Sequence, residues 1–175
     1  MHHRMLITLD SPSDADSEGV RHKAYNLLAN DDSFCGEGGR FGSPLCDWFV
    51  IGGRWSGMLA QSVIGGAFKD AVCARFPELV RDWYPQSLVD KHGDELDALW
   101  RNHGGIGLSP YTRSGYEEFG YPDDAVLLTQ GLYDAVLSDH AGQSLDRVGY
   151  ADLDGEELCP EFVGRKWLVV IYYHN

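Results

Sequence analysis

The stretch "RKWLVVIYYHN" (165–175) decides how the rest of the chain must fold. Seven consecutive apolar or aromatic residues, from Trp167 to Tyr173, include β-branched and aromatic side chains that favour β-strands. A run without polar alternation is typical of a strand whose two faces are both covered. The stretch therefore predicts a buried strand at the centre of a β-sheet.

Working outward from this strand, the chain alternates between strand-like and helix-like segments. We expect further strands at 4–10, 45–53 and 123–129, and helices within 13–31, 65–84, 93–105 and 130–140. Strands at both ends and in the middle, with helices between them, predict an α+β fold with a mixed or antiparallel sheet and three to four helices on one face. At 175 residues and 43% hydrophobic content, we expect one globular domain over 1–175.

The charge balance limits the classes of partner. The chain has 27 acidic and 14 basic side chains, for a net charge of −13. An acidic surface repels phosphate backbones, so we expect no direct nucleic-acid binding. The acidity serves solubility, attracts a basic partner, or imitates the charge of a nucleic acid.

Cysteine usage and hydropathy point to a cytoplasmic protein. Four cysteines, at 35, 46, 73 and 159, form no C-x-x-C pair. No secretory signal precedes residue 30, and no apolar run approaches the roughly 18 residues of a membrane span. We expect no membrane association, no cofactor and no metal site.

The stretch "CDWFVIGGRWSG" (46–57) has two interpretations. In the first, a core strand ends at a glycine turn and Arg54 pairs with one of the many acids. In the second, Gly52 and Gly53 allow a ligand or a second backbone to approach closely. Arg54 and an exposed Trp55 would then hold an anionic or planar group by hydrogen bonds and stacking.

A second candidate binding surface lies in the irregular segment 106–122. Its side chains have the composition of a recognition surface, and the members that we single out are Tyr111, Arg113, Tyr116 and Phe119. Alternatively, these aromatic residues attach a long loop to the body of the protein. The glycine-rich segment 35–44 is the other long irregular segment, and binding sites concentrate on such segments.

Candidate catalytic residues are few. His174 follows the predicted central strand and could act as a general base with Asp47, or with Asp123 or Asp124. Cys35 is a candidate reactive thiol if Arg40 lowers its pKa. The stretch "YADLDGEELCPE" (150–161) matches a calcium-binding loop only in part, and a solvated acidic turn is the simpler interpretation.

Three segments carry a resemblance to other proteins: "DWFVIGGRWSG" (47–57), "PDDAVLLTQGLYDAVLSD" (122–139) and "FVGRKWLVVIYYHN" (162–175). They resemble a group of uncharacterised bacteriophage and bacterial proteins with a D-W-[FY]-x-x-G-G-R-W core. The resemblance implies a phage or mobile-element setting, with functions such as host takeover or inhibition of a bacterial defence system. It implies no particular activity.

These observations favour a non-enzymatic binding protein that engages a bacterial protein or a small, anionic, nucleotide-like ligand. The competing hypothesis is a metal- or histidine-assisted hydrolase that uses His174, Asp47, Asp123 and Arg54. A structural or assembly component of a phage is the third hypothesis. Binding is preferred because no complete set of catalytic residues is recognisable in the sequence.

Overall fold

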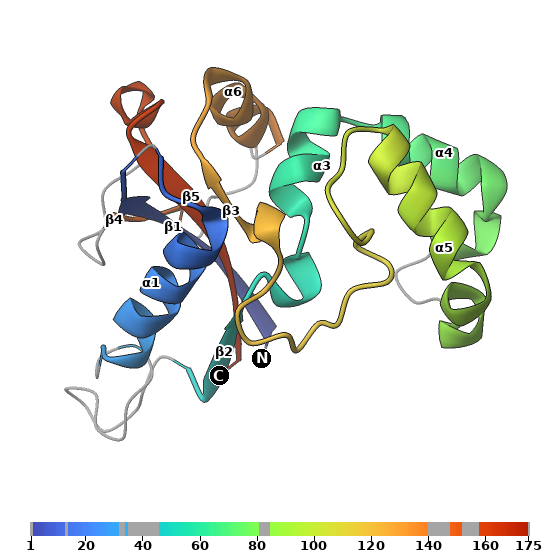
Figure 1. The fold of residues 1–175 in the computed structure, drawn as a ribbon, viewed down its shortest axis with the longest axis horizontal. Coiled ribbons are helices and arrows are strands. Elements are labelled where there is room, and N and C mark those ends of the chain that lie inside the picture. The colour runs from blue at the N-terminus through green and yellow to red at the C-terminus, as the bar shows by residue number, and fades with distance from the viewer. Residues whose placement is uncertain are drawn as a thin grey trace.

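The fold is built around β5 (Lys166–His174), which pairs with three other strands. The computed structural model describes residues 2–12, 14–31, 34, 46–80, 85–139, 148–151 and 158–174. All seven residues from Trp167 to Tyr173 are buried, and only the two end residues of the strand are partly exposed. The prediction of a central buried strand is therefore confirmed (Figure 1).

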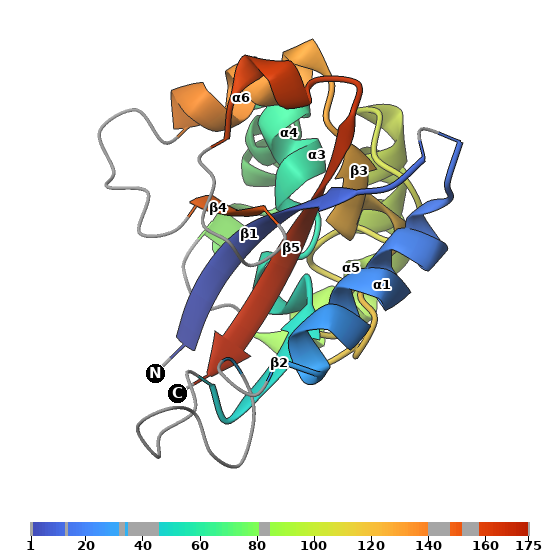
Figure 2. The same ribbon diagram turned by 90° about the vertical axis from the view of Figure 1, so that its left-hand side faces the viewer.

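One side of β5 pairs with β1 (His2–Asp10), and the other side pairs with two short strands. β2 (Trp48–Ile51) pairs with the C-terminal half of β5, and β3 (Ala125–Leu127) with its N-terminal half. These pairings are antiparallel, whereas β4 (Val148–Ala151) runs parallel to β1 at the edge of the sheet. Because β1 and β5 pair along their full lengths, the two ends of the described chain lie at the same end of the sheet (Figure 2).

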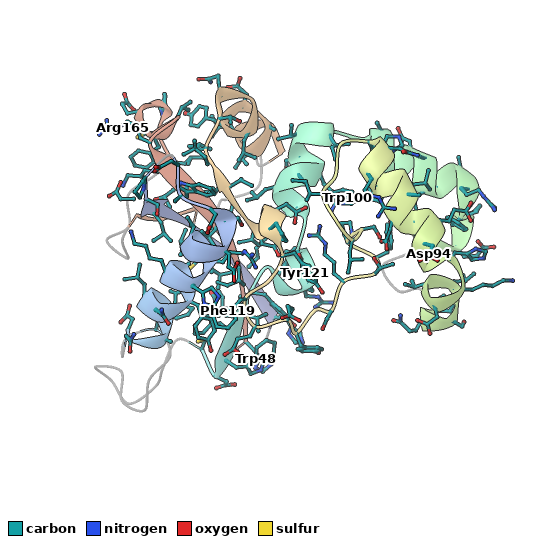
Figure 3. All side chains as sticks on the ribbon, in the orientation of Figure 1. Trp48, Asp94, Trp100, Phe119, Tyr121 and Arg165 are labelled. Atoms are coloured by element: carbon teal, nitrogen blue, oxygen red, sulfur yellow. The ribbon has the colours of Figure 1, made fainter. Side chains whose placement is uncertain are left out.

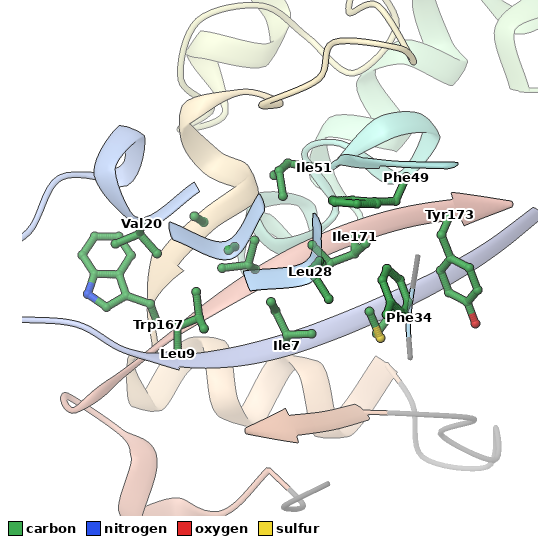
Figure 4. Close-up of a cluster of buried hydrophobic side chains, with 14 of the residues drawn as sticks. Ile7, Leu9, Val20, Leu28, Phe34, Phe49, Ile51, Trp167, Ile171 and Tyr173 are labelled. Carbon is green, nitrogen blue, oxygen red and sulfur yellow. The ribbon is translucent and has the colours of Figure 1, made fainter. Parts of the chain in front are cut away.

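Helix α1 (Ser17–Ala29) covers one face of the sheet. The carboxylate of Asp16 accepts a hydrogen bond from the backbone N–H of Gly19 at 2.6 Å, which caps the helix at its N-terminus. The apolar side of the helix packs on alternate residues of β1, β2 and β5 (Figure 4). This core cluster includes Ile7, Leu9, Val20, Ala24, Leu28, Phe49, Ile51, Val169 and Ile171.

The opposite face is covered by α3 (Met58–Ile64) and α6 (Gln130–Asp139). Leu59 of α3 and Leu132 and Val136 of α6 pack against Leu6, Leu168 and Val170 of the sheet. The hydroxyl of Thr129 accepts a hydrogen bond from the backbone N–H of Leu132 at 3.1 Å, as expected for the cap of α6. Towards the C-terminal end of β5 this face carries aromatic and polar side chains instead.

A separate apolar cluster joins α4 (Ala67–Arg75), a 3₁₀ turn (Pro77–Val80) and α5 (Gln86–Asn102), which lie to the right of the sheet in Figure 1. Trp100 is fully buried there, and its indole N–H donates to the carbonyl of Ile106 at 3.1 Å. The chain returns to the sheet through residues 103–121, which contain no helix or strand, and then enters a 3₁₀ turn (Pro122–Asp124) before β3. A further 3₁₀ turn (Pro160–Phe162) precedes β5.

The α+β class and the mixed sheet are confirmed. The expectation that the helices lie on one face was wrong, because α1 covers one face and α3 and α6 cover the other. The physical reason lies in β5, whose side chains are apolar on both faces and need cover on both. None of the helices within the described ranges is long and apolar enough to cross a membrane.

Candidate functional site

Three strands place Trp48, His174 and His2 in one row at the end of the sheet. The register pairs His174 of β5 with His2 of β1 on one side and with Trp48 of β2 on the other. Directly opposite residues of antiparallel strands point to the same face of the sheet. The three rings therefore share the face that α3 and α6 cover only at its other end.

Contacts within this row orient the rings. The ring of Trp48 stacks parallel to that of His174, with centroids 5.7 Å apart and planes within 1° of each other. His2 meets His174 edge-on with centroids 5.0 Å apart. On the outer side, Nδ1 of His174 lies 3.2 Å from a carboxylate oxygen of Asp47. The predicted pairing of His174 with Asp47 is thus present.

Tyr172 forms the next row inward and supports the first. Its ring is 3% exposed and contacts Trp48 and Trp55 edge-on, with centroids 5.0 Å and 5.2 Å away. Its hydroxyl lies 2.6 Å from Nδ1 of His2. Burial raises the pKa of Tyr172, so the hydroxyl keeps its proton at neutral pH.

The Gly52–Gly53 corner brings Arg54 and Trp55 beside this aromatic row. Both glycines are buried and have positive φ angles of 70° and 58°. A Cβ on Gly53 would lie 2.2 Å from the ring of Tyr172, and a Cβ on Gly52 would lie 2.2 Å from a carboxylate oxygen of Asp124. These glycines thus allow close approach to their own chain, and the sharp turn carries Arg54 outward. Trp55, expected to be exposed, is half-buried and packs against Tyr172 and the apolar cluster under α3 and α6.

Two arginines lie beside the row, although the chain as a whole is acidic. Arg54 is exposed, and its guanidinium carbon lies 5.8 Å from the centroid of the Trp55 ring. Arg4 lies beside Tyr172 in the next row of β1. Within the part of the chain that the structure describes, neither arginine forms an ion pair with a carboxylate.

The irregular segment adds one exposed aromatic side chain. Tyr116 is 73% exposed, and its ring centroid lies 6.0 Å from that of Trp48. Phe119 instead stacks on His22 of α1 at 4.0 Å, beside the helix in Figure 3. Tyr111 packs against the apolar cluster of the α4–α5 region. Of the aromatic residues predicted to form a recognition surface, Tyr116 is thus the exposed one, whereas Phe119 and Tyr111 attach the loop to the body.

We call this group the histidine–aromatic cluster. It consists of His2, Trp48, Trp55, Tyr116, Tyr172 and His174, flanked by Asp47, Arg4 and Arg54.

Arg113 and Asp123 belong to a buried ion pair that holds the irregular segment. The two terminal nitrogens of the guanidinium donate to the carboxylate of Asp123, at 2.6 Å and 2.8 Å, and both side chains are 2% exposed. Arg113 also donates to the hydroxyl of Ser56 at 2.9 Å and to the carbonyl of Leu108 at 2.9 Å. The predicted contact of Asp123 with His174 is absent, because its carboxylate is engaged by Arg113.

Asp124 is buried beside this pair and is structural as well. Its carboxylate accepts hydrogen bonds from the hydroxyl of Ser56 at 2.6 Å and from the N–H groups of Gly57 and Tyr121 at 2.9 Å and 2.8 Å. Burial nevertheless raises the pKa of Asp124 above its ordinary value, and these hydrogen bonds offset only part of the effect. The residue fixes the corner that carries Arg54.

Two further titratable groups of the cluster, besides Tyr172, have altered acidity. Loss of solvent around the ring lowers the pKa of His2, and the neighbouring His174 and Arg54 lower it further. A histidine with a lowered pKa is uncharged at neutral pH and can accept a proton. Burial also lowers the pKa of Arg4.

Among the described residues, no group of three or more His, Cys, Asp or Glu side chains could hold a metal ion. The acidic stretch 152–157 and the Cys35–Arg40 pair lie outside the described residues. No family model, curated protein or solved structure matches this chain.

The sequence alone identifies some residues of the histidine–aromatic cluster but not others. Arg54, Trp55, Tyr116, Asp47 and His174 were all singled out as candidates. Trp48, expected in the core, and His2, Arg4 and Tyr172 were not, because they join the cluster through the pairing of β2 and β1 with β5. Alternation within the strands 2–10 and 166–174 is the signal that could have placed the last three on one face.

Proposed function

We propose that this protein is a binding protein that takes a small, anionic, nucleotide-like ligand at the histidine–aromatic cluster. The observation that carries the proposal is Arg54, which is exposed beside Trp55 without a carboxylate partner among the described residues of a chain of net charge −13. What distinguishes Arg54 is its position beside the aromatic rings of the cluster. An arginine in that position is available to a phosphate.

The aromatic residues of the cluster suit the planar part of such a ligand. Trp48 and Tyr116 present rings 6.0 Å apart at the rim of the site. A base stacked on an aromatic side chain gains about 1–3 kcal/mol, with little dependence on its identity. Because Trp48 stands on a strand that is paired with β5, its position is fixed before the ligand arrives, which lowers the entropy cost of binding.

Tryptophan fluorescence tests the proposal directly, since Trp48 and Trp55 both lie at the site. We expect 5′-nucleoside monophosphates to quench the emission in a saturable manner. Arg54→Ala removes a hydrogen bond to a charged group, about 1.5–3 kcal/mol, and should weaken binding about tenfold or more. Arg165→Ala makes the same charge change at the opposite end of β5 and should leave binding intact (Figure 3). Equal quenching curves for wild type and Arg54→Ala would refute the proposal.

A bacterial protein is the second candidate for the bound partner. The observation in its favour is the 73% exposure of Tyr116 next to Trp48 and Arg54, because Trp, Tyr and Arg dominate the binding energy of protein interfaces. The resemblance to phage and bacterial proteins supports a role in host takeover or in blocking a defence system. A partner captured from bacterial lysate by the wild type, and lost with Tyr116→Ala but kept with Arg165→Ala, would favour this candidate.

A further inference from the structure

Three aromatic rings of the histidine–aromatic cluster form a path from the surface to a buried phenol. Tyr116 is 73% exposed, and its ring centroid lies 6.0 Å from that of Trp48. Trp48 in turn meets the ring of Tyr172 edge-on at 5.0 Å, and Tyr172 is 3% exposed. Centroid separations of about 4.5–7 Å are those of aromatic rings in contact. An electron can therefore pass from ring to ring without crossing solvent.

The hydroxyl at the inner end of this path has a proton acceptor beside it. Nδ1 of His2 lies 2.6 Å from the hydroxyl oxygen of Tyr172. Within the described part of the chain, this hydroxyl has no other hydrogen-bond partner. An uncharged imidazole that carries its proton on Nε2 accepts a hydrogen bond at Nδ1. The phenol of Tyr172 therefore donates to His2, along the line on which its proton can be transferred.

We propose that Tyr172 is a redox-active tyrosine that loses one electron to an oxidant at the protein surface and its phenol proton to His2. The electron leaves through Trp48 and Tyr116. The oxidant belongs to the class of strong one-electron oxidants, such as organic peroxyl radicals and photo-oxidised metal complexes. This activity is separate from the nucleotide binding proposed above and does not rest on it.

The step balances in electrons and protons. The oxidant takes one electron from Tyr116, Tyr116 takes one from Trp48, and Trp48 takes one from Tyr172. The O–H bond of Tyr172 breaks, and its proton forms an N–H bond with Nδ1 of His2. Trp48 and Tyr116 return to their starting states, and any proton that Tyr116 gives to water is taken back from water. The products are the reduced oxidant, a neutral tyrosyl radical at Tyr172 and an imidazolium at His2.

The hydrogen bond to His2 explains why the path ends at Tyr172. A phenol that loses an electron becomes a much stronger acid, so the electron leaves more readily when a base takes the proton in the same step. Because the pKa of His2 is lowered and the residue is exposed at the end of its strand, the imidazolium then releases its Nε2 proton to water. The remaining Nδ1–H donates a hydrogen bond to the radical oxygen.

The next residue of β5 supplies a matched tyrosine on the other face of the sheet. Tyr173 is 4% exposed and belongs to the core cluster under α1 (Figure 4). Its ring stacks on that of His3, with centroids 5.0 Å apart. Its hydroxyl, however, forms no hydrogen bond among the described residues. Tyr173 thus shares the burial and the neighbouring imidazole of Tyr172 but lacks the proton acceptor.

The test uses the full chain with photogenerated tris(bipyridine)ruthenium(III) as the oxidant and EPR spectra of samples frozen after the flash. We expect the wild type to form a neutral tyrosyl radical whose spectrum contains a coupling to an exchangeable proton, which disappears in deuterated water. That coupling reports the hydrogen bond from His2 to the radical oxygen. Tyr172→Phe keeps the ring contacts and should remove this signal, whereas the matched control Tyr173→Phe should retain it.

Two further variants test the proton acceptor and the route of the electron. His2→Ala should slow the formation of the radical at Tyr172 by about tenfold or more and abolish the exchangeable coupling, because the proton has lost its acceptor. His3→Ala should change neither property. Trp48→Phe keeps an aromatic ring that this oxidant does not oxidise, so it should slow the formation of the radical without removing the coupling.

Each contrary result overturns the inference. A wild type without a tyrosyl radical, or with a radical that lacks the exchangeable coupling, refutes the redox role of Tyr172, as do identical spectra of wild type and Tyr172→Phe. An undiminished rate in His2→Ala refutes the role of the acceptor, and an undiminished rate in Trp48→Phe refutes the route. If Tyr172→Phe does not fold, the loss of the coupling in His2→Ala decides the same question, because the hydroxyl that His2 contacts is that of Tyr172.

Discussion

Replacing the buried carboxylate of Asp123 by a neutral amide should strongly destabilise the folded protein. In Asp123→Asn, the guanidinium of Arg113 stays buried but loses the carboxylate that binds two of its nitrogens, at 2.6 Å and 2.8 Å. Both side chains are 2% exposed, so water cannot replace the lost partner. Breaking a buried pair by removing one partner costs about 3–5 kcal/mol.

An exposed ion pair of this same chain supplies the control. Arg75 and Glu95 approach to 2.7 Å, but their side chains are 57% and 41% exposed. Glu95→Gln should therefore cost about 0.2–1 kcal/mol. For a protein of this size 1 kcal/mol lowers Tm by about 2–4 °C, so we expect a decrease of about 6–20 °C for Asp123→Asn and of less than about 4 °C for Glu95→Gln.

Urea unfolding of both variants measures the free energy lost with the buried ion pair and with the exposed ion pair. If Asp123→Asn costs no more than Glu95→Gln, the pair is not desolvated and the reasoning from burial is wrong. The double variant Arg113→Met/Asp123→Leu sharpens the test. Because it removes both charges, it should be more stable than Asp123→Asn even though it changes more atoms.

Three further predictions concern the corner and the cluster. Gly53→Ala should cost clearly more than Gly65→Ala in urea unfolding, because both positions have positive φ but only at Gly53 would the new Cβ meet Tyr172, at 2.2 Å. Since burial raises the pKa of Asp124, its stabilising contribution is complete below its ordinary value of 3.8 and is lost as pH rises through the folded-state value. The stability of the wild type relative to Asp124→Asn should therefore decline as pH rises above about 4. Tyr116→Ala should change the unfolding free energy by less than about 0.5 kcal/mol, and nucleotide titrations should show weaker binding.

Elements whose signals are local could be predicted from the sequence. Seven consecutive apolar or aromatic residues predict β5. The capping residue Asp16, followed by apolar residues at helical spacing, predicts α1. Helix α3 was missed because it follows directly on the glycine corner, and its N-cap Gly57 offers no capping side chain. The first part of α5 was missed because Gly93 and a kink at His92 interrupt the pattern, and the helix was predicted to begin at 93.

The candidate site could be predicted only in part from the sequence. Arg54 and Trp55 share one corner, and the residue types of Asp47 and His174 suggested a pair. The burial of Arg113 was not predictable, because its partner lies ten residues away on a different turn and exposed and buried arginines look alike in sequence. The contribution of His2 depends on the register of two strands about 170 residues apart, which no local pattern specifies.

The central position of β5 has a consequence for the order of events during synthesis. Residues 166–174 are made after all the strands that pair with them, yet β1, β2 and β3 have no shared partner without β5. While these residues are still inside the ribosomal tunnel, β1 lacks the neighbour with which it pairs along its whole length, and α1 lacks much of the surface on which it packs. The nascent chain therefore exposes apolar helix and strand surfaces to chaperones until residues 166–174 emerge, and a truncation before residue 166 would leave the sheet without its centre.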